Sequence, residues 1–110
     1  MHTLHLRNFF ALVCLLLLLT ASVAAAAPAN HSALMADGAY RKAFGAYAAA
    51  EQEAMKRLDA RDFAAVREAV HAEMAESARL EISTGSSEAE AWSNAYGQGR
   101  DRLNRELTWN

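Results

Sequence analysis

The chain has 110 residues, enough for one small domain. Its 11 Lys and Arg residues and 13 Asp and Glu residues give a formal net charge of −2, and the charges are interspersed rather than gathered into a basic stripe. Nucleic-acid binding is therefore not expected, because it needs a surface that neutralises several phosphates. The single cysteine, Cys14, lies in an apolar N-terminal run, so we expect no disulfide and no thiolate chemistry in the domain that follows.

The N-terminal segment has the pattern of a secretory signal peptide. A short polar start precedes an unbroken apolar run over residues 9–19, and the stretch TASVAAAAPAN then offers Ala-x-Ala cleavage sites. We therefore expect residues 1–26 to be removed, leaving residues 27–110 as one secreted or periplasmic helical domain. The alternative is an uncleaved anchor, since residues 9–27 could just span a bilayer of about 30 Å. No cluster of Lys or Arg fixes either end of this segment, which favours cleavage. A membrane would be contacted only through this segment, if it is retained.

The remaining chain is predicted to be all-α. Its one proline is Pro28, and it is rich in Ala, Glu, Arg, Met and Leu, which favour helices. β-Branched aliphatic residues, which favour strands, are few. The periodicity predicts a small antiparallel three-helix bundle, with helices over about residues 32–58, 63–81 and 88–107.

The first predicted helix covers residues 32–58. Gly38 weakens its early turns, so a later start with Asp37 as the N-cap is an alternative. His31, just before this helix, is expected to be a solvated residue in a frayed start. The apolar stripe lies within about 60° of one line at 100° per residue and comprises Tyr40, Phe44, Tyr47, Met55 and Leu58.

The second predicted helix covers residues 63–81. Asp62 is well placed to accept the first backbone N–H groups, and Gly85 in STGSS marks the following loop. The predicted stripe is Phe63, Val66, Val70 and Met74, with Leu80 at its edge.

The third predicted helix covers residues 88–107. Ser87 and Glu90 have the spacing of a capping box. Gly97 and Gly99 lie inside the helix and each costs roughly 1 kcal/mol relative to alanine, so a kink or break is expected there. The predicted stripe is Trp92, Tyr96, Leu103 and Leu107.

The predicted core contains few large apolar side chains, with alanine at the other inward positions. A small domain without disulfides is marginally stable on such a core. A protein partner or a second copy could complete the burial, and a modestly stable monomer is the equal alternative. Trp109, which does not continue the third stripe, is a candidate partner contact or a chain end that folds back onto the bundle. The tyrosine hydroxyls are expected at the wet edges of the core.

The stretch REAVHAEM, residues 67–74, holds the candidate metal ligands. His71 with Met74 is an imidazole–thioether set suited to copper, and Glu68 with His71 places two ligands on adjacent turns, as di-iron carboxylate bundles require. A di-iron site is not expected, because it needs a second Glu-x-x-His pair. Met74 also occupies a core position, and methionine commonly fills gaps in cores. We therefore interpret His71 as a helix residue that borders the core, with copper or zinc binding as the alternative.

Some charged residues fall at core-facing positions, chiefly Glu51 and Glu81, with Arg67 and Arg100 at the stripe edges. Glu51 could belong to an acid–base or ligand site, which would place a cavity beside its carboxylate. The simpler interpretation is that such side chains pair across helices or reach solvent.

The expected function is that of an exported interaction module, which binds a protein partner or another copy of itself. An enzyme is not expected, because no glycine-rich phosphate loop follows a strand and His71 is the only histidine placed inside a predicted helix. The alternative is a periplasmic protein that binds copper or zinc through His71 with Met74 or Glu68.

Overall fold

The computed structural model describes residues 27–109, and the predicted signal peptide, residues 1–26, lies outside the described residues. The described chain is all-helical, as predicted, and contains no strand. Its helices are α2 (His31–Leu34), α3 (Gly38–Arg57), α4 (Ala60–Ser83) and α5 (Glu88–Trp109). None of the helices in this part of the chain is long and apolar enough to cross a membrane.

The predicted first helix is two helices, so residues 27–109 form four helices where three were predicted. The chain leaves helical geometry at Asp37, whose backbone is extended and whose carboxylate accepts the N–H of Tyr40 at 3.0 Å. Asp37 thereby caps α3, which confirms the later start. The short helix α2 is left as a separate turn.

The start of α4 differs from the prediction by one turn. Asp59, not Asp62, is the N-cap, and its carboxylate accepts the N–H of Asp62 at 2.8 Å. Asp62 therefore lies in the first turn of α4, where a negative charge is favourable. Only Leu58 and Asp59 separate α3 from α4, so these two helices are tightly tied at one end.

The boundary between α4 and α5 follows the predicted turn chemistry. Gly85 has a φ of 107°, which side chains rarely adopt, and the N–H of Ser86 reaches back to the carbonyl of Glu81 at 3.0 Å. Ser87 Oγ accepts the N–H of Glu90 at 3.1 Å, which confirms the hydroxyl half of the capping box. The expected break near Gly97 and Gly99 is absent: α5 runs through both residues without interruption.

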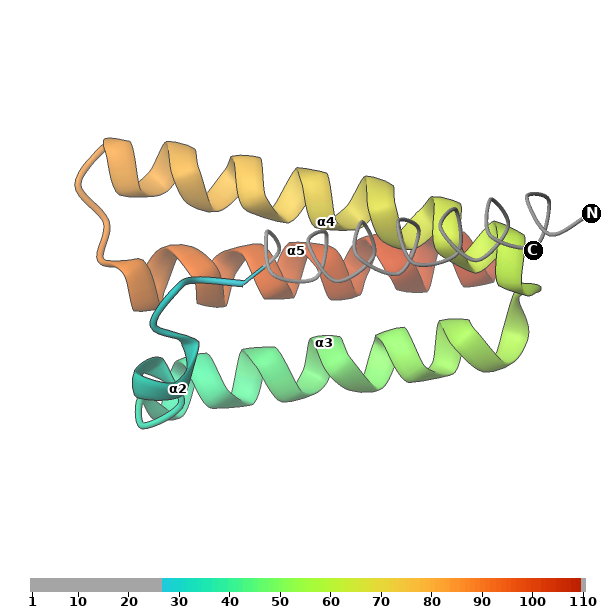
Figure 1. Ribbon diagram of the computed structural model, residues 1–110, viewed down its shortest axis with the longest axis horizontal. Helices are drawn as coiled ribbons and strands as arrows, with labels where there is room; N and C mark the ends of the chain where they lie inside the picture. The colour runs from blue at the N-terminus through green and yellow to red at the C-terminus, as the bar shows by residue number, and fades with distance from the viewer. Residues whose placement is uncertain (1–26, 110) are drawn as a thin grey trace, which may run out of the picture.

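The long helices pack with α5 in the middle. Both α3 and α4 lie along α5, and they contact each other much less, with consecutive helices antiparallel (Figure 1). Small residues spaced four apart, Ala91, Ala95 and Gly99, allow the neighbours to approach the axis of α5 closely. Met74 uses this space, because a Cβ on Gly99 would overlap its sulfur atom.

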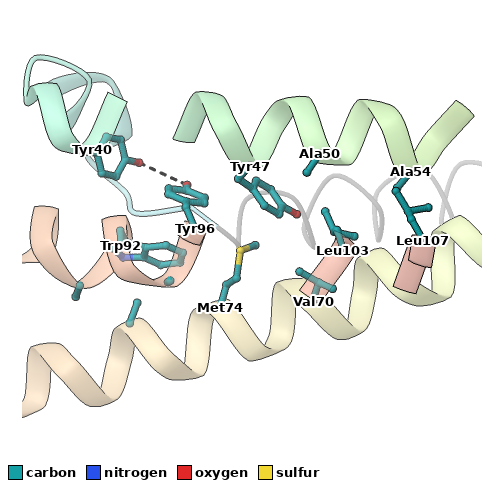
Figure 2. Packing of buried hydrophobic residues seen from close by; sticks show 13 residues of the cluster. Tyr40, Tyr47, Ala50, Ala54, Val70, Met74, Trp92, Tyr96, Leu103 and Leu107 are labelled. Carbon is teal, nitrogen blue, oxygen red and sulfur yellow. Dashed lines mark hydrogen bonds between the residues drawn. The ribbon is translucent and has the colours of Figure 1, made fainter. Parts of the chain in front are cut away.

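The core lies along both sides of α5 (Figure 2). The predicted positions on α5 are confirmed, as are Tyr40 and Tyr47 on α3 and Val70 and Met74 on α4. Phe44, Leu58, Phe63 and Val66 are only partly buried. The buried apolar residues are Tyr40, Tyr47, Ala50, Ala54, Val70, Met74, Ala78, Ala91, Trp92, Ala95, Tyr96, Leu103 and Leu107.

The prediction for Met55 was wrong, because this side chain is 52% exposed. The buried face of α3 turns toward Ala50 and Ala54 instead, whose small side chains let α3 come close to α5.

Candidate functional site

A charged residue sits on the inner side of α3. Glu51 lies one turn after the buried Tyr47 and next to the buried Ala50, so the spacing that buries those residues also turns Glu51 inward. Its side chain is only 19% exposed. A carboxylate in this position needs compensation, because burying an unpaired charge is costly.

The compensation comes from α4. Arg67 and His71 are four residues apart and therefore lie on one face of α4, which is turned toward α3. Arg67 Nε lies 2.6 Å from Glu51 Oε1, and His71 Nε2 lies 3.6 Å from the same oxygen. Neither Arg67 Nε nor Glu51 Oε1 completes a well-aligned hydrogen bond, so their contact is an ion pair.

Tyr47 completes the group, which we call the polar cluster: Tyr47, Glu51, Arg67 and His71. The Tyr47 ring lies 6.2 Å from the His71 ring, measured between centroids, and its buried hydroxyl is near Glu51 without completing a well-aligned hydrogen bond. Burial, followed by the nearby Glu51 carboxylate, raises the pKa of Tyr47. The hydroxyl therefore stays protonated.

The pKa of Glu51 reflects opposing effects. Burial by itself would raise it, but the neighbouring His71 and Arg67 outweigh burial and hold the pKa of Glu51 below its usual value. At neutral pH Glu51 is therefore an anion beside the Arg67 cation. This is the pairing across helices that the simpler interpretation of Glu51 predicted.

An acid–base site at Glu51 would need a cavity beside its carboxylate. A cavity of about 250 Å³ lies along α4 and α5 and does not include Glu51. It is lined by Glu73, Met74, Gln98, Gly99, Asp101, Arg102 and Arg105. Arg102 at its rim is already paired with Glu73 and Glu106.

The three candidate metal ligands, Glu68, His71 and Met74, lie in different environments and do not converge on one point. His71 is 9% exposed and borders the core, as predicted, with its ring nitrogen toward Glu51. Met74 is buried against Gly99, whereas Glu68 is exposed. The described residues contain no group of three or more His, Cys, Asp or Glu side chains that could hold a metal ion. The copper or zinc hypothesis gains no support from this arrangement.

A second polar link was missed by sequence reasoning. His31 is half-buried and its Nδ1 lies 2.6 Å from the hydroxyl of Tyr40, which is 3.5 Å from the hydroxyl of Tyr96. The His31 ring also packs edge-on against Phe44, with centroids 4.7 Å apart. His31 therefore fastens α2 to the bundle, and its expected position in a frayed, solvated start was wrong.

The expectation of wet tyrosine hydroxyls was also wrong. Tyr40, Tyr47 and Tyr96 are all buried, and burial is the main cause that raises the pKa of Tyr40 and of Tyr96. The pattern of large apolar residues placed these rings correctly. It carried no information on where their hydroxyl groups would end.

Trp109, the candidate partner contact, is the last residue of α5, and its side chain lies outside the described part of the structure.

Comparisons with protein-family models, with curated proteins and with solved structures found no match for this chain. What the protein does is therefore inferred from its own residues.

Proposed function

We propose that this protein is an exported interaction module that associates with a second copy of itself through the C-terminal turn of α4. The supporting observation is that Leu80 and Ile82, both in that turn, are 50% and 42% exposed. Export is proposed from the apolar run and the Ala-x-Ala sites of residues 1–26.

The exposure of Leu80 and Ile82 matters because the core contains few large apolar side chains. Five of the thirteen buried apolar residues are alanine, so the chain has few large apolar side chains with which to build its core. Fully burying a leucine or isoleucine contributes about 1.5–3 kcal/mol. A contact that covers Leu80 would therefore supply apolar burial that the isolated domain lacks, and Ile82, which points about 160° away around the helix, can be covered only where the partner also reaches past the helix end.

A second copy fits the charges around this turn. Arg79 and Glu76 form an exposed ion pair one turn before the end of α4, so both signs of charge stand beside Leu80. A two-fold symmetric contact can place the Arg79 of each copy near the Glu76 of the other, because such an interface joins the same patch on both subunits. The formal net charge, −2 for the whole chain and −3 after removal of Arg7 with residues 1–26 (10 basic minus 13 acidic residues), gives little repulsion between copies.

Sedimentation velocity on the exported protein tests the proposal. We expect the mass to rise toward that of a dimer as concentration increases to about 1 mM, since a small contact binds weakly. The double variant Leu80→Ser/Ile82→Ser should remain a monomer over this range. Because both side chains are already exposed, this variant should keep the stability of the parent.

Met55→Ser is the matched control. Met55 is as exposed as Leu80 but lies near the end of α3, at the other end of the bundle (Figure 1), so its substitution should leave the dimer intact. A parent protein that stays monomeric throughout would refute self-association. In-cell crosslinking could instead capture a different protein. If the Leu80→Ser/Ile82→Ser variant fails to capture it, that protein is the partner and the second copy is not.

A further inference from the structure

The residues that precede α3 fold back onto the bundle (Figure 1), and we call residues 27–36 the strap. Its anchor is His31, whose Nδ1 lies 2.6 Å from the hydroxyl of Tyr40 and whose ring packs edge-on against Phe44. The strap thus covers aromatic side chains in the first turns of α3. Three apolar residues of the strap are themselves buried or half-buried: Pro28, Leu34 and Met35.

The strap rests on aromatic rings that come from two helices. Tyr40 and Phe44 stand on α3, and the ring of Tyr96 on α5 lies 5.7 Å and 5.3 Å from theirs, measured between centroids. The hydroxyl of Tyr40 is also 3.5 Å from that of Tyr96. We call these three side chains the aromatic site. Without the strap, Tyr40 and Phe44 would lose the cover that His31 gives them, and exposing large apolar rings to water is unfavourable.

Asp37 and Gly38 form the hinge where the strap meets α3. The flanking methionine and alanine residues are good helix formers, and the periodicity predicted one helix over residues 32–58. The helix is broken because the backbone of Asp37 is extended and its carboxylate caps α3. This pair of residues therefore stands between the bent chain and one continuous helix that joins α2 to α3.

A straight hinge would carry the strap away from its own aromatic site. His31 and Tyr40 are nine residues apart, which corresponds to about 14 Å along one continuous helix. In that form His31 cannot reach the Tyr40 of its own chain, but it can reach the Tyr40 of a second copy. The contacts of the strap are then remade between copies, and the continuous helix supplies carbonyl partners to the first N–H groups of α3. Loss of the cap and the cost of association oppose this exchange.

We infer that the aromatic site is a second interaction surface, and that its occupant is the strap of another copy of this chain. Opening of the hinge at Asp37 and Gly38 joins α2 to α3, and two copies then exchange their straps. The bent hinge keeps the aromatic site covered in the single chain, so the parent protein exchanges only weakly. This surface shares no residue with the proposed contact at Leu80 and Ile82, and the inference stands if that contact fails.

Hinge variants test the exchange in the Leu80→Ser/Ile82→Ser background, which removes the proposed contact through α4. The double-alanine variant, Asp37→Ala/Gly38→Ala, loses the cap and gains a helix former at residue 38, where a Cβ would meet nothing within 4 Å. Loss of the cap favours opening about fivefold per chain, so the association constant of the exchanged dimer should rise about 25-fold. Sedimentation velocity up to about 1 mM should then show dimers for this variant and monomers for the background protein.

The proline variant, Asp37→Ala/Gly38→Pro, is the matched control in the same background. It loses the same cap, but proline at residue 38 prevents a helix from continuing through the hinge. The bent form accepts this proline, because Gly38 is the first residue of α3 and the backbone at Asp37 is already extended. The proline variant should therefore remain monomeric over the whole concentration range, with a helix signal in far-UV circular dichroism equal to that of the background protein.

Isotope-filtered NMR on dimers of one labelled and one unlabelled copy shows whose strap fills the aromatic site. We expect nuclear Overhauser effects between His31 of one copy and Tyr40 or Phe44 of the other. If the double-alanine variant loses its helix signal, Gly38→Ala alone keeps the cap and takes its place, with an expected rise in association of about fivefold. The inference is overturned if the folded alanine variant does not associate more than the background protein, if the proline variant dimerises equally, or if these Overhauser effects stay within one copy.

Discussion

At the scale of the residue, Gly99 shows how closely α4 and α5 pack. A Cβ at this position would overlap Met74 Sδ and lie 3.0 Å from Met74 Cγ and 3.2 Å from Tyr47 Cδ2. We expect Gly99→Ala to destabilise the protein by about 1–3 kcal/mol through overpacking, although alanine is the better helix former.

The neighbouring Gly97 is the control for this prediction. A Cβ there would meet nothing within 4 Å, so Gly97→Ala should stabilise the protein by roughly 0.5–1 kcal/mol. Urea denaturation followed by circular dichroism measures both changes. Equal effects of the two substitutions would show that Met74 does not approach Gly99 as described.

Two buried tyrosines should respond in opposite ways to the loss of their hydroxyl groups. Tyr40→Phe removes the partner of His31 and should cost about 1 kcal/mol, whereas Tyr47→Phe removes a hydroxyl without a hydrogen bond and should be neutral or stabilising. Denaturation of the two variants under one set of conditions gives the comparison. A larger loss for Tyr47→Phe would contradict the assigned contacts.

At the scale of the element, the start of α4 gives a prediction about two neighbouring acids. Asp59 caps the helix through the N–H of Asp62, so Asp59→Ala should cost about 1 kcal/mol. Asp62→Ala removes only a favourable charge in the first turn, worth about 0.3–1 kcal/mol, and should cost less. The reverse order of thermal stabilities would place the cap at Asp62, where the sequence pattern had placed it.

Large apolar residues made the long helices predictable. Their spacing identified the buried side of α5, and Val70 with Met74 identified that of α4, which in turn placed His71 at the border of the core. The same spacing put Glu51 on the inner side of α3. Helical periodicity fixes the direction of a side chain from its own helix, and these conclusions needed nothing more.

The partners of those side chains could not be predicted. The contacts of Glu51 with Arg67 and of His31 with Tyr40 depend on how separate helices are placed, which periodicity does not contain. The burial of Ala50 and Ala54 was hidden for another reason. Alanine occurs on both inner and outer faces here, so it does not mark a stripe, and the larger Met55 was taken for the core residue.

At the scale of the whole molecule, stability should depend on pH through Glu51. The depressed pKa of Glu51 stabilises the fold above the carboxylate range, and this contribution disappears as pH falls through the folded pKa. Glu51→Gln should therefore be less stable than the parent at pH 7, with the difference shrinking toward pH 3. Urea denaturation across this range measures it, and a difference that does not vary with pH would argue against a stabilising carboxylate.

The central structural claim is that α5 is the shared core helix, with α3 and α4 packed on it and joined to each other mainly by the polar cluster. Native-state amide hydrogen exchange on the exported protein, resolved by residue, tests this most directly. The slowest amides should lie in the middle of α5, around Ala95 and Leu103, with α3 and α4 exchanging faster through partial opening. Amides of α3 or α4 that outlast those of α5 would contradict the claim.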